Sequence, residues 1–200
     1  MTYLEYPVGP HTRRHGPSGY VNYRSYKPWL RDEFSFRCVY CLVRERWYYY
    51  GSDNFGVDHI IAKSTDDSLE TDYNNLVYAC SRCNSAKSIH RIVDPCVKSM
   101  ADILRIEPDG TVRSLSTPDG DLAIDILNLN DAEAVEFRHQ IMRSIKNCEH
   151  ADDEESLDFM LGYPTNMPNL VAMRCQNSKP SAAAGCFYLR KARGQLPARY

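Results

Sequence analysis

Two CxxC pairs are the residues of this chain whose types and spacing most clearly indicate chemistry. Cys38 and Cys41 form the first pair, and Cys80 and Cys83 form the second. A two-residue spacer lets both sulfurs of a pair reach one ion, and structural zinc is held tetrahedrally by four such thiolates. The four cysteines therefore predict a structural Zn²⁺ site. The 38 residues between the pairs leave room for two strands.

A second set of residues between and after these pairs suits phosphodiester hydrolysis. Asp58 and His59 are adjacent, and Asn84 directly follows the last cysteine. Hydrolysis at neutral pH needs a base to activate water and a cation to neutralise charge on the phosphate. His59 suits the first task because the unperturbed pKa of imidazole lies near working pH. Asp58 and Asn84 supply the oxygen ligands that Mg²⁺ takes. Neighbours on a strand face opposite sides, so Asp58 and His59 can share a site only where a strand ends or is irregular.

A helix is predicted to begin at about Arg82 and to end before Pro95. Positions at i, i+3, i+4 and i+7 lie on one helical face, and here that face would carry Asn84, Lys87, Ser88 and Arg91. Its N-terminus would favour an anion through the helix dipole. We therefore expect nucleic-acid contacts from Lys87, Arg91 and Arg82. A solvated helix face is the alternative for Lys87 and Arg91.

The elements that must position these residues form a central region, residues 36–95. Its strands are predicted at 46–50, 56–61 and 76–79. Residues 1–35 form an N-terminal arm rich in aromatic and basic residues, with Tyr20, Tyr23, Tyr26 and Trp29 at every third position. These rings suit either stacking on nucleic-acid bases or packing onto the central region, and packing is favoured.

Residues 96–200 form a C-terminal α+β extension. A Pro-Asp-Gly turn at 108–110 predicts a hairpin of 103–106 with 111–115, and Asp131 predicts the start of a helix that runs to about Asn147. An acidic run at 149–158 has six acids and no Lys or Arg, whereas 162–200 has six Lys or Arg and no acid. This basic tail has two interpretations: it binds the DNA backbone or it pairs with the acidic run.

Composition and charge indicate which classes of function are compatible with this chain. The net charge is -2, which does not exclude nucleic acid, because only the clustering of basic groups on one face matters. The N-terminus lacks the apolar core of a signal peptide, and no apolar run reaches membrane-spanning length. We expect a soluble cytoplasmic protein with no membrane partner. The remaining cysteines, expected to be ordinary buried thiols, are Cys96, Cys148, Cys175 and Cys186.

The segments CVYC, VDHIIAKS and YNNLVYACSRCNSAKS together resemble the HNH endonuclease family, in its form with four zinc-binding cysteines. The resemblance covers about residues 36–92. It implies an α+β fold, with a zinc-stapled ββα-metal (HNH) core to which helices and a β-hairpin are added. It also implies cleavage of DNA with one divalent ion. These residues therefore predict a metal-dependent HNH endonuclease, a phosphodiester hydrolase.

Roles follow from the resemblance one residue at a time. Asp58 matches the carboxylate metal ligand, His59 the general base, and Asn84 the second metal ligand. Asn75 matches the central asparagine that orients the loop carrying the base, and Lys87 matches a frequent lysine of the family. Members with a second helix histidine have it where this chain has Ser88. Two protein ligands favour Mg²⁺ or Mn²⁺ over a histidine-rich transition-metal site.

Two other hypotheses stay open from the sequence. One is a non-catalytic zinc module that binds DNA or a partner protein. The other is a nuclease subunit of a bacterial antiviral defence complex that stays silent until a regulatory partner, such as an ATPase, releases it. A plasmid-nicking assay with magnesium and a chelator control separates cleavage from simple binding.

Overall fold

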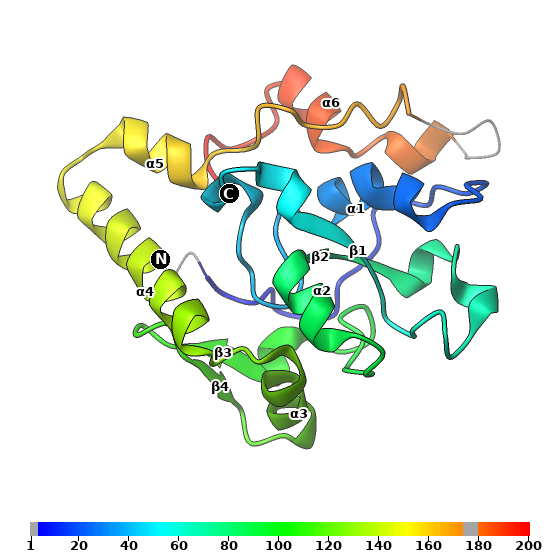
Figure 1. Cartoon of the computed structure of the whole chain (residues 1–200). Helices are drawn as coiled ribbons and strands as arrows, with labels where there is room; N and C mark the ends of the chain where they lie inside the picture. Colours follow the sequence, from blue (N-terminus) through cyan, green and yellow to red (C-terminus); the bar gives the residue numbers. More distant parts are fainter. Residues whose placement is uncertain (1–3, 174–179) are drawn as a thin grey trace.

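A two-stranded antiparallel sheet and the helix that follows it lie at the centre of the molecule (Figure 1). The computed structural model describes residues 4–173 and 180–200. Strand β1 (Phe55–His59) pairs with β2 (Leu76–Cys80) in a register that places His59 opposite Leu76. Every residue of β2 is buried. These two strands confirm the predictions at 56–61 and 76–79.

Helix α2 (Ser81–Lys87) follows β2 without a loop. Its N-cap is Cys80, whose sulfur accepts a hydrogen bond from the Cys83 amide at 3.5 Å. The helix ends at Lys87 because Ser88 has a φ of 49°, outside the helical region. The chain then runs without regular structure and buries Ile92 in the core. The helix thus begins near Arg82 and ends before Pro95 as predicted, but it is too short to include Arg91, which does not continue the face that carries Asn84.

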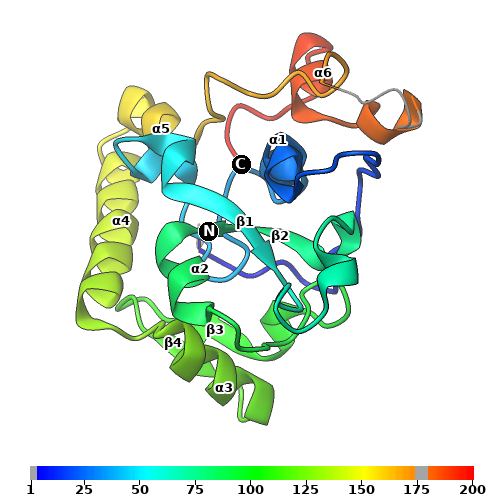
Figure 2. The ribbon, with the colours of Figure 1, turned by 45° about the vertical axis from the view of Figure 1, so that its right-hand side comes forward.

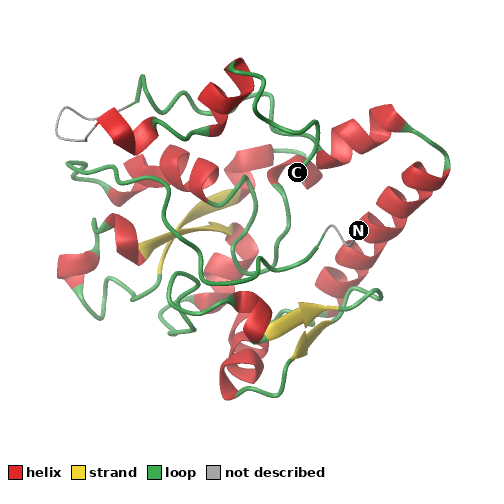
Figure 3. Ribbon diagram, turned by 180° about the vertical axis from the view of Figure 1, so that it is seen from behind, coloured by secondary structure: helices red, strands yellow, loops and turns green. Residues whose placement is uncertain are grey.

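The N-terminal region crosses the molecule as a loop before it enters helix α1 (Lys27–Glu33), as Figure 3 shows from behind. A short 3₁₀ helix, η1 (Tyr23–Tyr26), leads into α1. Tyr26 and Trp29 are buried against the rest of the protein. Packing of the aromatic side chains, the favoured interpretation of their spacing, is confirmed for these two residues.

The C-terminal region forms the hairpin β3 (Leu104–Ile106) and β4 (Val112–Ser114), then helix α3 (Pro118–Leu127). The long helix α4 (Ala132–His150) runs along one side of the molecule to α5 (Glu154–Leu161), as Figure 2 shows. Helix α6 (Phe187–Ala192) lies near the C-terminus of the chain. Both the predicted hairpin and the Asp131 cap of α4 are present.

One buried apolar cluster extends from Leu4 to Cys186 and joins all three regions of the sequence. A smaller cluster links α4 to α5 through Ile145, Leu157 and Leu161. The predicted strand at 46–50 is wrong: a 3₁₀ turn, η2 (Glu45–Trp47), stands there, because Trp47 and Tyr48 pack against these clusters while Tyr49 stays exposed. The fold is α+β.

The acidic run ends α4 and forms α5, and the end of the basic tail returns to it. Arg199 Nε lies 2.7 Å from Asp158 Oδ1, and the same guanidinium also pairs with Glu154. Pairing within the chain is thus confirmed for Arg199, whereas Arg174, Lys179 and Cys175 lie outside the described residues. None of the described helices is long and apolar enough to span a bilayer.

Candidate active site and metal centre

The four cysteines of the CxxC pairs converge at one buried point. Their sulfur atoms all lie within 4.8 Å of one another, and the sulfurs of Cys41 and Cys80 are 3.7 Å apart. A tetrahedral zinc with bonds of about 2.3 Å places its sulfur ligands roughly 3.8 Å apart. Burial raises the pKa of the Cys38 thiol well above its usual value, so a bound cation is needed to hold it as thiolate. The arrangement fits a structural zinc site.

Helix α4 covers this metal centre from one side. A cavity of about 240 Å³ between them is lined by Cys41 and Cys80 and by Ala134, Phe137 and Arg138 of α4. The Phe137 ring stacks on Tyr48, with centroids 5.7 Å apart. The first part of α4 therefore faces the cysteine cluster through Ala134 and Phe137.

Asp58 faces α2 and is almost fully buried, at 4% exposure. Its Oδ2 accepts a hydrogen bond from the Tyr40 hydroxyl at 2.5 Å, and its Oδ1 lies 3.3 Å from Lys87 Nζ. Burial raises the pKa of the carboxyl, and the Lys87 charge and these hydrogen bonds act in the opposite direction. The carboxylate is thus held on the same face of β1 as the helix.

His59 is the last residue of β1 and has different neighbours. Its Nε2 is 3.0 Å from the Glu70 carbonyl oxygen, and its ring meets Tyr23 edge-on with centroids 4.7 Å apart. A carbonyl oxygen can only accept, so Nε2 carries a proton, and in the neutral form of the ring Nδ1 is the unprotonated nitrogen. No hydrogen bond within the described residues joins this ring to Asp58 or Asn84.

Asn75 holds the loop that connects β1 to β2. Its Oδ1 accepts from the Ile61 amide at 2.8 Å, and its Nδ2 donates to the carbonyls of Ile61 and Leu69 at 2.9 and 3.2 Å. Glu70, whose carbonyl fixes His59, is the next residue after Leu69. These contacts tie Asn75 to Ile61 and Leu69 of the loop, and the orienting role that the resemblance implies for it stays a prediction.

Asn84 lies in the first turns of α2, over β1. Its Nδ2 donates to the Val57 carbonyl at 3.4 Å, and a Cβ on Gly56 would lie 3.5 Å from the same nitrogen. Residues two apart on a strand share a face, so Asn84 above Gly56 lies on the Asp58 side of β1. Its Oδ1 has no hydrogen-bond partner in the described part of the chain.

The three predicted nucleic-acid contacts have different environments. Lys87 is 0% exposed, and its Nζ donates to the His59 carbonyl at 2.6 Å, so a direct phosphate contact is inconsistent with this geometry. Arg82 is also engaged: it donates to Asn128 O at 2.8 Å and lies 3.6 Å from Asp131. Arg91 alone is exposed, although it lies beyond the end of α2.

Tyr23, which contacts His59, and two cationic side chains beside the Tyr23 ring were not among the predicted site residues. Lys63 Nζ lies 5.3 Å and the Arg24 guanidinium 5.6 Å from the centre of the Tyr23 ring, which contacts His59. The sequence signal for Tyr23 and Arg24 was the aromatic-basic pattern of the N-terminal arm. Lys63 had no signal beyond its position in the loop after His59.

A divalent ion is the cofactor that the resemblance implies for this site. Asp58 of β1 and Asn84 of α2 lie on the same side of β1 and would offer one carboxylate and one amide oxygen, although Lys87 and Tyr40 already contact the carboxylate. Such hard oxygen donors suit magnesium or manganese. Apart from the cysteines, no cluster of three His, Cys, Asp or Glu ligand groups occurs among residues 4–173 and 180–200. The donor set fits an ion that keeps most of its water.

Residues 38–89 match the family model described as HNH endonuclease. The segment is therefore similar to an HNH domain. It begins at Cys38, the first cysteine of the cluster, and contains β1, β2 and α2, so the match coincides with the observed ββ-helix unit. An HNH domain indicates nuclease activity in general. A search among curated proteins gives no match.

Proposed function

We propose that the protein is a metal-dependent HNH endonuclease that hydrolyses DNA phosphodiester bonds, with His59 as the general base. The observation that carries the proposal is the Nε2–Glu70 hydrogen bond, which leaves His59 Nδ1 to accept a proton. It lies within the segment that the HNH model matches. The Tyr23 ring restricts rotation of the imidazole.

The other residues take supporting roles in this mechanism. Asp58 and Asn84 would hold the divalent ion, which would stabilise negative charge on the phosphate when bound. Lys87 and Tyr40 fix the Asp58 carboxylate rather than touching substrate. Asn75 keeps the loop in place through its contacts with Ile61 and Leu69. Lys63, Arg24 and Arg91 are the exposed cations that we propose for phosphate contact, in place of Lys87 and Arg82.

The test is nicking of supercoiled plasmid by the full chain with Mg²⁺ or Mn²⁺, against an EDTA control. His59→Ala should lower the cleavage rate by about 10²–10⁴-fold, because a positioned general base contributes that much. His90→Ala removes an exposed imidazole and should cleave at the wild-type rate. Undiminished cleavage by His59→Ala, with zinc content and circular dichroism unchanged, would refute the role. A labelled RNA of the same sequence tests the choice of DNA.

One observation favours a second candidate, a non-catalytic zinc module that binds DNA or a protein. Lys87 already supplies a cation beside Asp58, and both groups are buried. This candidate predicts DNA binding in a gel-shift assay without metal-dependent nicking.

An effector role in a bacterial defence complex stays a prediction, and equal activity with and without a partner ATPase would exclude it.

A further inference from the structure

A cavity of about 350 Å³ lies beside the zinc-site loop and away from the proposed catalytic residues. Cys38, Val39 and Leu42 form one wall of it. Pro7 and Gly9 line it from the N-terminal arm, and other lining residues come from the ends of α1 and α6. None of the residues Asp58, His59 and Asn84 lines this cavity. Its size falls within the range of small-molecule sites.

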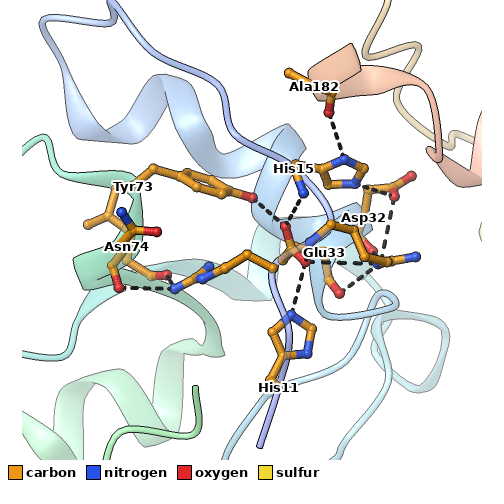
Figure 4. Close-up of polar contacts among 10 residues, drawn as sticks. His11, His15, Asp32, Glu33, Tyr73, Asn74 and Ala182 are labelled. Carbon is orange, nitrogen blue, oxygen red and sulfur yellow. Dashed lines mark hydrogen bonds and ion pairs between the residues drawn. The ribbon is translucent and has the colours of Figure 1, made fainter. Parts of the chain in front are cut away.

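The acidic residue of this cavity is already neutralised from within the protein. Glu33 accepts hydrogen bonds from His11 Nε2 at 2.9 Å, from the amides of Arg14 and His15 at 2.8 and 3.0 Å, and from the Tyr73 hydroxyl at 3.0 Å (Figure 4). Four donors saturate a carboxylate. Glu33 therefore has no capacity left to pair with the other cations of the cavity.

Arg14 is also held by the protein. Its guanidinium donates to the Glu33 carbonyl at 2.8 Å and to the Asp32 carbonyl, and it lies 3.7 Å from the Asp32 carboxylate. Asp32 in turn accepts from His15 Nε2 at 2.8 Å and from the Phe187 amide at 2.8 Å. These contacts tie the N-terminal arm, α1 and α6 together as the frame of the cavity.

Arg37 and Arg190 are the two cations that this network does not neutralise. Neither guanidinium makes a hydrogen bond or an ion pair with any residue in 4–173 or 180–200, although Arg190 lies 5.3 Å from the centre of the Phe187 ring. Burial lowers the pKa of Arg37, as expected for a desolvated cation without a carboxylate partner. Two half-buried guanidinium groups facing one cavity favour a ligand with negative charge.

We propose that this cavity binds a small phosphorylated molecule with an aromatic body, of the class of a nucleoside monophosphate. Arg37 and Arg190 supply two positive charges and planar donor groups, which match a phosphate dianion better than a single carboxylate. The apolar walls from Phe34, Met100 and Phe187 suit the aromatic body. Because Cys38 lines the same cavity, the bound ligand also contacts the loop that holds the zinc.

The experiment uses AMP as the probe on the zinc-loaded full chain, with adenosine and inorganic phosphate as partial probes. AMP at about 100 times its Kd should raise Tm by on the order of 5 °C, and each partial probe should bind more weakly. Arg190→Gln should weaken AMP binding about 10- to 100-fold in calorimetry, the loss expected for a charged hydrogen bond. Arg37→Gln provides a second variant, in case the first one lowers Tm without ligand.

The matched control is Arg193→Gln, which removes an exposed charge just beyond α6 and should leave AMP affinity unchanged. An equal loss in this control would indicate general charge attraction and overturn the proposal. The absence of saturable AMP binding, or full affinity in both Arg37→Gln and Arg190→Gln, would overturn it as well. The readout is binding rather than cleavage, so failure here leaves the proposed nuclease function untouched.

Discussion

At the scale of single residues, the partners of each side chain decide its chemistry. Asp58 and His59 are adjacent in sequence, yet Asp58 faces Lys87 and Tyr40 while His59 faces Glu70 and Tyr23. The strand alternation explains this separation. A shared phosphate would therefore lie at the end of β1, where the strand geometry stops constraining His59.

Glu33 provides a stability prediction at this scale. Burial by itself would raise the pKa of this carboxyl, but hydrogen bonds from His11 and Arg14 and the charges of both His15 and His11 lower it from 4.5 to about 2. A lowered folded-state pKa stabilises the fold above the unfolded value, and this contribution is lost as pH falls from about 4.5 to 2. The contribution is about 3 kcal/mol.

Glu33→Gln should therefore reduce the free energy of unfolding at pH 7 by about 3 kcal/mol and flatten its pH dependence between pH 4.5 and 2. Urea unfolding at several pH values measures this. Glu155→Gln, which removes an exposed acid of α5, serves as the control. Its free energy of unfolding should fall between pH 4.5 and 2 as in the wild type. If Glu33→Gln still loses as much unfolding free energy between pH 4.5 and 2 as the wild type does, other carboxyl groups cause that loss.

At the scale of elements, a helix has the bounds that its local sequence predicts only where the tertiary contacts permit them. Asp131 caps α4 through the amides of Glu133 and Ala134, so its start was predictable. The early end of α2 was not, because it depends on Ser88 adopting a positive φ and on Ile92 reaching the core. The helix ends at Lys87, well before Pro95.

Arg138 connects α4 to the β3–β4 hairpin. It is 1% exposed, and it donates to the carbonyls of Gly110 and Leu129 at 2.6 Å each. Arg138→Met should lower the free energy of unfolding by about 3 kcal/mol, because two buried carbonyls lose charged donors. Urea denaturation measures the loss. Arg143→Met, on an exposed position of the same helix, should have little effect; an equal loss there would point to helix propensity instead.

At the scale of the whole molecule, the cysteine cluster joins segments that are distant in sequence. Cys38 and Cys41 precede the sheet, Cys80 and Cys83 follow it, and α4 covers the cluster. The larger of the two buried clusters joins the three regions around it. Loss of the ion would therefore affect the entire fold rather than one loop.

Cys80→Ser should bind much less zinc and lose its cooperative thermal transition, since structural zinc supplies folding free energy. Zinc content per chain and a thermal melt followed by circular dichroism measure both effects. Cys148→Ser changes a half-buried thiol of α4 outside the cluster and should keep one zinc per chain. A Cys80→Ser protein with full zinc and an unchanged Tm would contradict the structural role.

The sequence by itself determined the features that depend on short-range spacing. The CxxC pairs predicted the four-cysteine cluster, the apolar runs predicted β1 and β2, and Asp58–His59 and Asn75 lie in the segment that matches the HNH model. Each of these signals is local, because a two-residue spacer or an alternating pattern has the same geometric meaning wherever the chain folds.

Only the tertiary structure decided which partner each charged side chain meets. Lys87 and Arg82 were both predicted to contact nucleic acid, but one is buried against β1 and the other bonds to the loop between α3 and α4. Tyr23 reaches His59 from the N-terminal arm. Such contacts join residues far apart in sequence, and they arise from packing of the whole core, which no local pattern encodes.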